Sequence, residues 1–278
     1  MKLKGKVSVV TGGGRGIGKN IALAFAREGS VVVVAARSID EIESTAQEIR
    51  QIGVDSIAVP TDVTRLNEVE KLVRIVTQRF NTIDILVNAA AIQGPIGSII
   101  DAPNLEWQKT IQTNLVGLYY CCRTVLPIMI AQRRGKIINV SGGGAVYPRP
   151  NFSAYSCSKA AVVRLTETLA EELRNHNIQI NTMSPGASRT RMTEEIIKAG
   201  RAAGEEELLH AKSLLRDGGI DPEKQARLAV FLASKESDGL SGRMLHANED
   251  WPSIAGRIPE VMSGELYTVR RVSPLTKS

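Results

Sequence analysis

Residues 7–18 of this 278-residue chain read VSVVTGGGRGIG, a run of β-branched residues that passes directly into a cluster of glycines. The first part is typical of a buried strand, and the helical spacing of Ile17, Ile21 and Phe25 indicates a helix after the glycines. Glycines at such a junction let the backbone turn sharply, and the helix N-terminus presents free N–H groups and a positive dipole. This stretch therefore predicts a site for a phosphate group.

Two well-known nucleotide motifs come close to this stretch without matching it. A mononucleotide P-loop requires Ser or Thr after its lysine, where this chain has Asn20. The GxGxxG spacing fails because Ile17 stands at the position of the third glycine. The pattern that fits is T-G-x-x-x-G-x-G, and its strand–helix context favours a dinucleotide site.

Apolar runs alternate with helical stretches along the rest of the chain. Several are nearly continuous in Val and Ile, as in strands that are buried on both faces of a parallel sheet. We expect an α/β fold with a doubly wound, seven-stranded parallel sheet and helices on both faces. The expected strands are Val7–Val10, Val31–Ala35, Ser56–Val59, Ile83–Val87, Lys136–Val140, Ile178–Met183 and Arg243–Leu245.

Two segments depart from this alternation. Residues 188–220 are polar and helical and contain several glycines, which is typical of an insertion that covers a site. Residues 248–278 show no clear periodicity. We therefore expect one domain over residues 1–247, with a substrate lid at 188–220, followed by a C-terminal extension that wraps the body or a partner subunit.

Composition excludes several classes of protein. With 43% hydrophobic and 23% charged residues the chain can form a full core, and its net charge of +6 is too scattered to predict nucleic-acid binding. We expect no membrane association, because no run of 18 apolar residues occurs. Three cysteines and no secretion signal favour the cytoplasm, and three well-separated histidines predict no metal site.

The end of the second strand bears on the choice of cofactor. Dinucleotide folds that take NAD carry an acidic residue there, but this chain reads Arg37-Ser38 and has no carboxylate until Asp40. The planar cation of Arg37, with Arg15 as a second charge, suits a 2′-phosphate. The sequence therefore favours NADP, with NAD possible; the alternative is a solvated surface arginine.

Tyr155 and Lys159 lie four residues apart in a helical stretch, so their side chains share one face. A phenol has a pKa of about 10, and a nearby ammonium at an effective dielectric of about 20 lowers it by roughly two units. The pair predicts proton transfer by Tyr155. The alternative is an ordinary pair on a helix surface.

Six motifs now occur in one order: TGGGRGIG, Asp62-Val63, Asn88-Ala-Ala, Asn114, YSCSK and Pro185-Gly186. In this order, over residues 3–246, the chain resembles the short-chain dehydrogenase/reductase superfamily, in its single-domain branch of about 250 residues. The resemblance implies a Rossmann-type fold that binds NAD(P) and exchanges hydride with a carbonyl or alcohol carbon.

The resemblance also implies roles for individual residues. Tyr155 would give a proton to the carbonyl oxygen, Lys159 would hold the nicotinamide ribose, and Asn114 would seat a water. The long helices near residues 104–131 and 155–176 resemble those that pair in family homodimers and homotetramers. The implied cofactor-binding residues are Gly12, Gly14, Arg15, Ile17, Arg37, Ser38, Asp62, Val63, Asn88, Tyr155, Lys159, Ser188 and Thr190.

One position breaks the family pattern. The serine that donates to the substrate oxygen usually precedes the tyrosine by thirteen residues, where this chain has Gly142. Ser141 reaches the site only if the chain bulges, which the following glycines favour. We expect Ser141 to substitute; a water or a backbone N–H of the glycine run are the alternatives.

Taken together, these features predict an NADP(H)-dependent oxidoreductase that acts on the carbonyl or secondary alcohol of a small molecule. Aromatic residues make up only 4% of the chain, which favours aliphatic, sugar-like or acyl substrates. Gln93, Tyr147, Arg149 and His210 are candidates to face the pocket. Arg149 lies between two prolines and is a candidate anion contact, with a solvated surface-loop arginine as the favoured alternative. The alternatives are a dehydratase or epimerase with retained cofactor, and a cofactor-binding regulator with weak catalysis.

Overall fold

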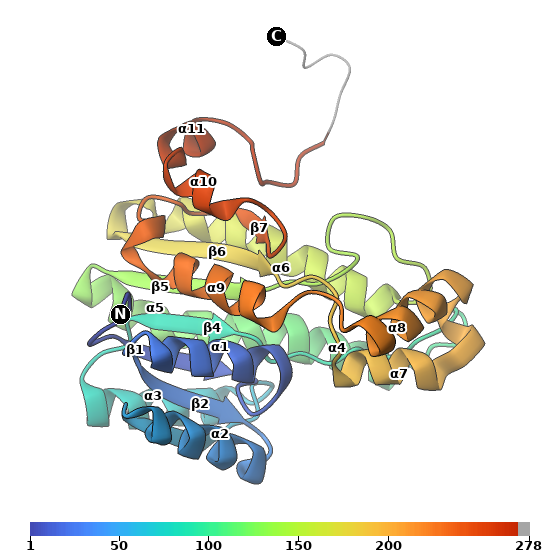
Figure 1. Ribbon diagram of the computed structural model, residues 1–278, viewed down its shortest axis with the longest axis horizontal. Coiled ribbons are helices and arrows are strands. Elements are labelled where there is room, and N and C mark those ends of the chain that lie inside the picture. The colour runs from blue at the N-terminus through green and yellow to red at the C-terminus, as the bar shows by residue number, and fades with distance from the viewer. Residues whose placement is uncertain (272–278) are drawn as a thin grey trace.

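The computed structural model describes residues 1–271, which contain a seven-stranded sheet in the order β3-β2-β1-β4-β5-β6-β7 (Figure 1). Every neighbouring pair of strands is parallel. The predicted fold class is confirmed, and the expected strand ends differ from the observed ones by at most two residues. The strands are β1 Val7–Thr11, β2 Val31–Ala36, β3 Ser56–Pro60, β4 Ile85–Asn88, β5 Gly135–Val140, β6 Ile178–Ser184 and β7 Met244–His246.

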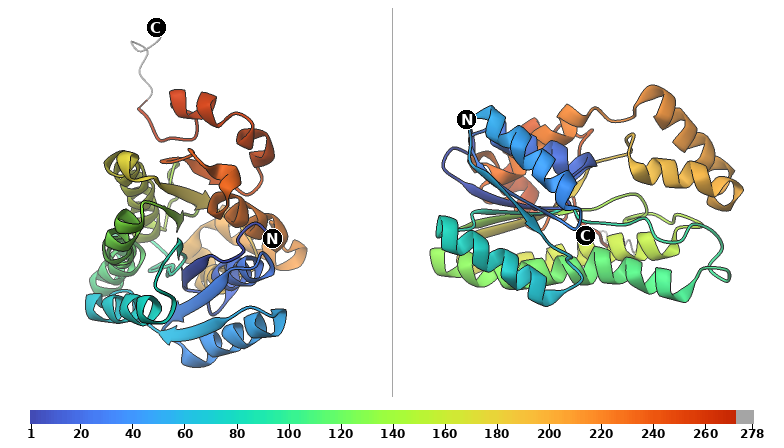
Figure 2. Two further views of the ribbon diagram at one scale, coloured as in Figure 1. Left: turned by 90° about the vertical axis from the view of Figure 1, so that its left-hand side faces the viewer. Right: turned by 90° about the horizontal axis from the view of Figure 1, so that it is seen from below.

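Helices cover both faces of the sheet (Figure 2). Helices α1, α2 and α9 contribute to the core on one face, and α3, α5 and α6 to the core on the other. The α-helices are α1 Gly16–Arg27, α2 Ile39–Ile52, α3 Leu66–Phe80, α4 Asn104–Ile111, α5 Gly117–Gln132, α6 Ser153–Glu172, α7 Arg191–Ala199, α8 Glu205–Asp217, α9 Pro222–Ala233, α10 Trp251–Ala255 and α11 Ile258–Ser263.

The central strands are apolar throughout because both of their faces are covered. In β2, Val32 and Val34 pack into the core with α1 and α2, whereas Val33 and Ala35 pack into the core with α3 and α5. Successive strand residues point to opposite faces, so each face requires its own apolar set. This is why continuous Val and Ile runs, rather than alternating ones, marked the strands.

The strand order also fixes where a ligand can bind. From β1 the chain passes first outward to β2 and β3, then returns to the other side of β1 to form β4. Helices that leave β1 and β4 therefore lie on opposite faces, and a crevice opens at the carboxyl ends of these two strands.

The predicted lid segment, residues 188–220, forms α7 and α8 with a short 3₁₀ helix, Gly200–Ala203, between them. These helices lie beyond the carboxyl ends of the strands, at the end of the molecule where the crevice opens (Figure 1). The division of the chain into a main domain, a lid and an extension stays a prediction.

After β7 the chain folds back onto the body through α10 and α11. The rings of Trp251 and Phe231 pack with their centroids 5.2 Å apart. Further on, the N–H of Met244 in β7 donates to the carbonyl of Tyr267 at 2.8 Å, and Arg270 pairs with Glu167 of α6 at 2.9 Å. Residues 272–278 of the expected extension lie outside the described residues.

One helical stretch, residues 104–131, is long and apolar enough by composition to cross a membrane. The absence of any run of 18 apolar residues predicted no such segment, because polar residues interrupt every run. The mean hydropathy of this stretch, 1.3, is nevertheless high enough for a membrane-spanning helix. Leu118, Cys121, Val125 and Met129 of this stretch are buried in the core beneath the sheet. Packing in the core therefore accounts for part of its apolar character, because 39% of its most apolar 18 residues are buried.

Candidate active site

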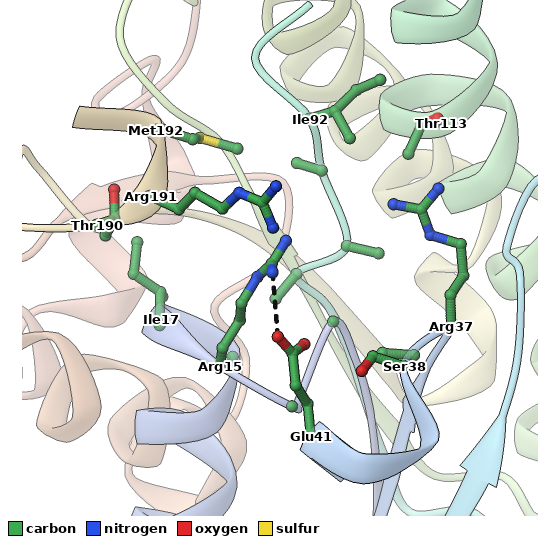
Figure 3. A pocket seen from close by; sticks show the side chains of 18 of the residues that line it. Arg15, Ile17, Arg37, Ser38, Glu41, Ile92, Thr113, Thr190, Arg191 and Met192 are labelled. Carbon is green, nitrogen blue, oxygen red and sulfur yellow. Dashed lines mark hydrogen bonds and ion pairs between the residues drawn. The ribbon is translucent and has the colours of Figure 1, made fainter. Parts of the chain in front are cut away.

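A cleft of about 840 Å³ opens at the carboxyl ends of β1, β2 and β4 and is bounded on one side by α7 (Figure 3). A volume of several hundred Å³ is typical of a ligand site. Nine of the predicted cofactor-binding residues line it: Gly12, Gly14, Arg15, Ile17, Arg37, Ser38, Asp62, Val63 and Thr190.

The glycine loop requires its glycines. Gly12 has φ +68°, and a Cβ there would lie 2.8 Å from the backbone of Ala90. A Cβ on Gly18 would lie 2.2 Å from the carbonyl oxygen of Gly12. The loop is therefore packed directly against the strand ends and the start of α1, with no room for side chains at these positions. No side chain caps the first N–H groups of α1. Those N–H groups and the positive end of the helix dipole are available to a phosphate.

Two cationic side chains of the cleft differ in their surroundings: Arg15 follows the glycine loop, and Arg37 follows β2. Arg15 pairs with Glu41 at 3.1 Å, whereas Arg37 points into the cleft toward Thr113 (Figure 3). Among the described residues Arg37 has no ion-pair partner. Asp62 accepts hydrogen bonds from the backbone and hydroxyl of Thr64, which holds its carboxylate in a local turn.

Four of the predicted cofactor residues do not line the cleft: Asn88, Ser188, Tyr155 and Lys159. The side chain of Asn88 is buried between β4 and β5, where its amide donates to Asn139 at 2.9 Å. The hydroxyl of Ser188 lies 3.3 Å from the amide nitrogen of Gln225, which donates to it. In this structure the side chains of Asn88 and Ser188 support the walls rather than face the cleft.

Tyr155 and Lys159 project from one face of α6, one turn apart, as predicted. Lys159 donates to the carbonyl of Val140 at 2.8 Å, and its Nζ lies 5.6 Å from the centre of the Tyr155 ring. Tyr155 is only 7% exposed, because Phe152 and Ile196 pack beside it.

The expected shift in the pKa of Tyr155 is wrong for this arrangement. Burial raises the pKa of Tyr155 to about 12, an effect that the charge of Arg149 opposes. The same burial lowers the pKa of Lys159 to about 8. The sequence argument treated the ammonium as the dominant influence, but loss of water around the phenolate outweighs it when the ring is covered.

Asn114 lies in a π-helical turn, Gln112–Val116, that interrupts the long helix between α4 and α5. The side chain of Asn114 accepts from the N–H of Ile92 and donates to the carbonyl of the same residue, both at 2.9 Å. Its amide also donates to Ser158, whose hydroxyl donates to the carbonyl of Tyr155. Asn114 therefore fixes the segment after β4 relative to α6. Single π-turns inside helices are frequent at functional sites.

The structure does not bring Ser141 into the site. The N–H of Ser141 donates to Met183 at 2.8 Å, so the ladder of β5 and β6 continues in register through this residue without a bulge. Its hydroxyl is buried without a hydrogen-bond partner among the described residues. Gly142 takes the inward-facing position, and a Cβ there would lie 2.3 Å from the Tyr155 hydroxyl.

The segment predicted to form a lid is joined to the body by a partly buried ion pair. Arg149 binds Glu207 of α8 through two hydrogen bonds of 2.6 and 2.7 Å, and its guanidinium stacks 3.9 Å from the Phe152 ring centre. Arg149 is thus neither free to hold a substrate anion nor solvated. The pair holds α8 over the segment that carries Tyr155.

Several residues that line the cleft were not predicted to bind the cofactor. Gln93, which the sequence analysis named only as a pocket candidate, is 3% exposed, and its amide nitrogen has no hydrogen-bond partner among the described residues. For most of the others the signal was a place after the Asn88 strand end or beside Thr190; Thr113 and Glu41 carried no such signal. The others are Gly16, Gly18, Ala36, Glu41, Thr61, Ala89, Ala90, Ala91, Ile92, Thr113, Arg189, Arg191, Met192, Glu194 and Glu195.

Comparison with known proteins agrees with this geometry. Residues 6–200 match the family described as short chain dehydrogenase. The 3-oxoacyl-[acyl-carrier-protein] reductase of Thermotoga maritima is 35% identical over 245 residues, which cover 88% of this chain and 97% of the relative. The enzyme of the same name from Staphylococcus epidermidis is 34% identical over 244 residues, 87% of this chain and 97% of the relative.

Solved structures show the same architecture. Xylitol dehydrogenase with bound NAD⁺ superposes with a TM-score of 0.83 at 28% identity, over 88% of this chain and 98% of that one. Actinorhodin polyketide ketoreductase with NADPH superposes with a TM-score of 0.81 at 28% identity, over 87% of this chain and 95% of that one. The family match covers more than half of the chain, and the two relatives align with 88% and 87% of it. This protein therefore belongs to the short-chain dehydrogenase family.

Proposed function

We propose that this protein is an NADP(H)-dependent oxidoreductase that reduces the carbonyl group of a small aliphatic or acyl substrate, or oxidises the corresponding secondary alcohol. The observation that carries this proposal is the pairing of Tyr155 and Lys159 on α6. Lys159 binds the carbonyl of Val140 at the carboxyl end of β5, the strand beside β4, whose end borders the cleft. The 3-oxoacyl reductases among its relatives support the reduction of an acyl carbonyl.

The cleft fits a dinucleotide. Its glycine loop offers free N–H groups at the start of α1, and its elongated lining runs from Arg37 and Ser38 to Thr190. At the β2 end Arg37 offers a planar cation, and no acidic residue follows the strand directly, which supports NADP over NAD. One relative of known structure holds NAD⁺ and another NADPH, so the proposed preference of this chain rests on Arg37 at the end of β2.

When bound, a nicotinamide cofactor supplies or accepts the hydride at the reacting carbon. In reduction, the Tyr155 hydroxyl gives its proton to the carbonyl oxygen: the phenolic O–H bond breaks as the alcohol O–H bond forms. With its pKa lowered to about 8, Lys159 keeps its charge near neutral pH and stabilises the phenolate that results. Asn114 positions both residues through the Ser158 hydrogen bond.

Access to Tyr155 requires motion of the lid. The phenol is 7% exposed, and Ile196 of α7 and Ala211 of α8 share its apolar cluster. A substrate therefore reaches the hydroxyl only when α7 and α8 move outward. Closure afterwards excludes water from the reacting atoms.

A second candidate is a cofactor-binding regulator with weak catalysis. Gly142 and the covered phenol of Tyr155 favour it, because the site then lacks one hydroxyl donor and shields the other. The loss of one such donor typically lowers a rate by about 10²- to 10³-fold. Turnover separates the two candidates.

The test measures NADPH and NADH oxidation by the purified protein with a 3-oxoacyl thioester, aliphatic ketones and keto sugars. The proposal expects turnover with NADPH on at least one of them, and loss of it in Tyr155→Phe, which keeps the ring but removes the proton. Tight NADPH binding without turnover on any carbonyl supports the regulator.

The proposal includes a cytoplasmic homodimer or homotetramer. Cys121, Cys122 and Cys157 are unpaired, as suits a reducing compartment, and Tyr119 of α5 is 44% exposed. Light scattering of the purified protein tests the oligomeric state.

A further inference from the structure

Two arginines face each other across the middle of the cleft. Arg15 precedes α1 at the end of the glycine loop, and Arg191 is the first residue of lid helix α7. Both line the cleft, and their guanidinium groups point toward each other from opposite walls (Figure 3).

The two positive charges together favour an anion between them. Two like charges that face each other across a cleft repel, and neither is matched by a carboxylate from the opposite wall. Arg15 pairs with Glu41 of α2 at 3.1 Å, and Arg191 approaches Glu195 of its own helix only to 3.7 Å. Their side chains are 52% and 64% exposed, so each retains free donors.

The position along the cleft indicates which anion suits it. Arg37 and Ser38 mark one end, and Thr190 with Met192 marks the other (Figure 3). Arg15 lies between these ends, beside the uncapped N–H groups of α1. In an extended dinucleotide the group at this middle point is the pyrophosphate.

We propose that Arg191 clamps the cofactor pyrophosphate against Arg15 and the start of α1, and that this contact draws the lid closed. The inference rests on the proposed dinucleotide function and adds a residue of the lid to it. Because Arg191 belongs to α7, an anion that binds it stabilises the closed position of α7 and α8 over Tyr155. Linkage makes the coupling reciprocal: a closed lid also retains the cofactor more tightly.

The test compares the binding of NADPH and NADH, followed by fluorescence, in the natural protein, Arg191→Ala and Arg201→Ala. Arg201 is a matched control, since it is an exposed lid arginine that does not line the cleft. Loss of one charge-assisted contact raises a dissociation constant roughly tenfold. We expect this increase for both cofactors in Arg191→Ala and for neither in Arg201→Ala.

Hydrogen exchange provides a second measurement that does not depend on turnover. NADPH should slow exchange in residues 191–217 of the natural protein and of Arg201→Ala, and much less in Arg191→Ala at saturating cofactor. Unchanged affinity in Arg191→Ala overturns the clamp. Weaker binding of NADPH alone also overturns it, because the contact would then be to the 2′-phosphate. If the natural protein binds neither cofactor, the dinucleotide function itself fails.

Discussion

The hydroxyl of Tyr155 occupies the space that a side chain at Gly142 would fill: a Cβ built on Gly142 lies 2.3 Å from it. No Cβ approaches an oxygen so closely, so any other residue at this position must displace the phenol. The missing side chain at Gly142 therefore leaves the space in which the Tyr155 hydroxyl is packed.

Gly142→Ser should raise the rate of carbonyl reduction by about 10²-fold, because it moves the phenol outward and adds a hydroxyl donor to the substrate oxygen. Gly142→Ala is the matched control, since it displaces the phenol without adding a donor. Steady-state kinetics with a 3-oxoacyl thioester provide the measurement. An equal gain in Gly142→Ala would show that displacement alone is responsible.

Arg37→Ala should weaken NADPH binding by about tenfold or more and leave NADH binding unchanged, because only NADPH carries a phosphate on the adenosine ribose. Arg74→Ala, at an exposed position of α3 away from the cleft, controls for loss of one positive charge. Equal weakening of both cofactors would place Arg37 at a different part of the dinucleotide.

The rate of reduction should fall as the pH rises through about 8. The pKa of Lys159 is lowered to about 8, so its stabilising charge is lost above that pH, whereas the phenol of Tyr155 keeps its proton up to about 12. Lys159→Arg keeps a charge at all these pH values. We expect it to be slower and to show no decline near pH 8; a retained decline would assign the titration to another group.

Lys159 also makes stability depend on pH. A folded-state pKa below the ordinary value of 10.5 means that the unfolded chain binds more protons between about 8 and 10.5. The contribution of Lys159 to the free energy of unfolding should therefore increase with pH across this window. Urea denaturation at several pH values, with Lys159→Met as the reference, measures it.

Glu207→Gln should loosen the predicted lid by breaking its partly buried pair with Arg149. The side chains are 12% and 25% exposed, so we expect a loss of about 1–3 kcal/mol in stability and a higher KM. Glu206→Gln, on the exposed neighbouring position, is the control. A double-mutant cycle with Arg149→Met isolates the pair energy; a coupling near zero would mean that packing alone holds α8.

Much of the fold could be predicted because its signals are local. Continuous apolar runs such as Val31–Ala36 are typical of strands that are covered on both faces. The glycine loop in turn predicts the first connection between a strand and a helix. The positions of Tyr155 and Lys159 followed from helical spacing alone. Arg15 and Arg37 followed from the order of strand, loop and helix.

The rest depends on contacts between distant parts of the chain. Arg149 and Glu207 are 58 residues apart, and neither residue signals its partner. The π-turn at Asn114 adds one residue to a helical turn, which an apolar period of 3.6 does not reveal. The raised pKa of Tyr155 depends on what covers the ring, and that covering comes from Phe152 together with Ile196 of the distant segment 188–220.

The C-terminal segment has a consequence for assembly. The outward N–H of Met244 at the β7 edge is already satisfied by Tyr267 of the same chain, and the opposite edge strand carries Pro60, which has no N–H to offer. Strand addition by a second molecule therefore lacks one backbone donor at each margin of the sheet. Continuing the sheet into another copy at β7 would break the bond between Met244 and Tyr267.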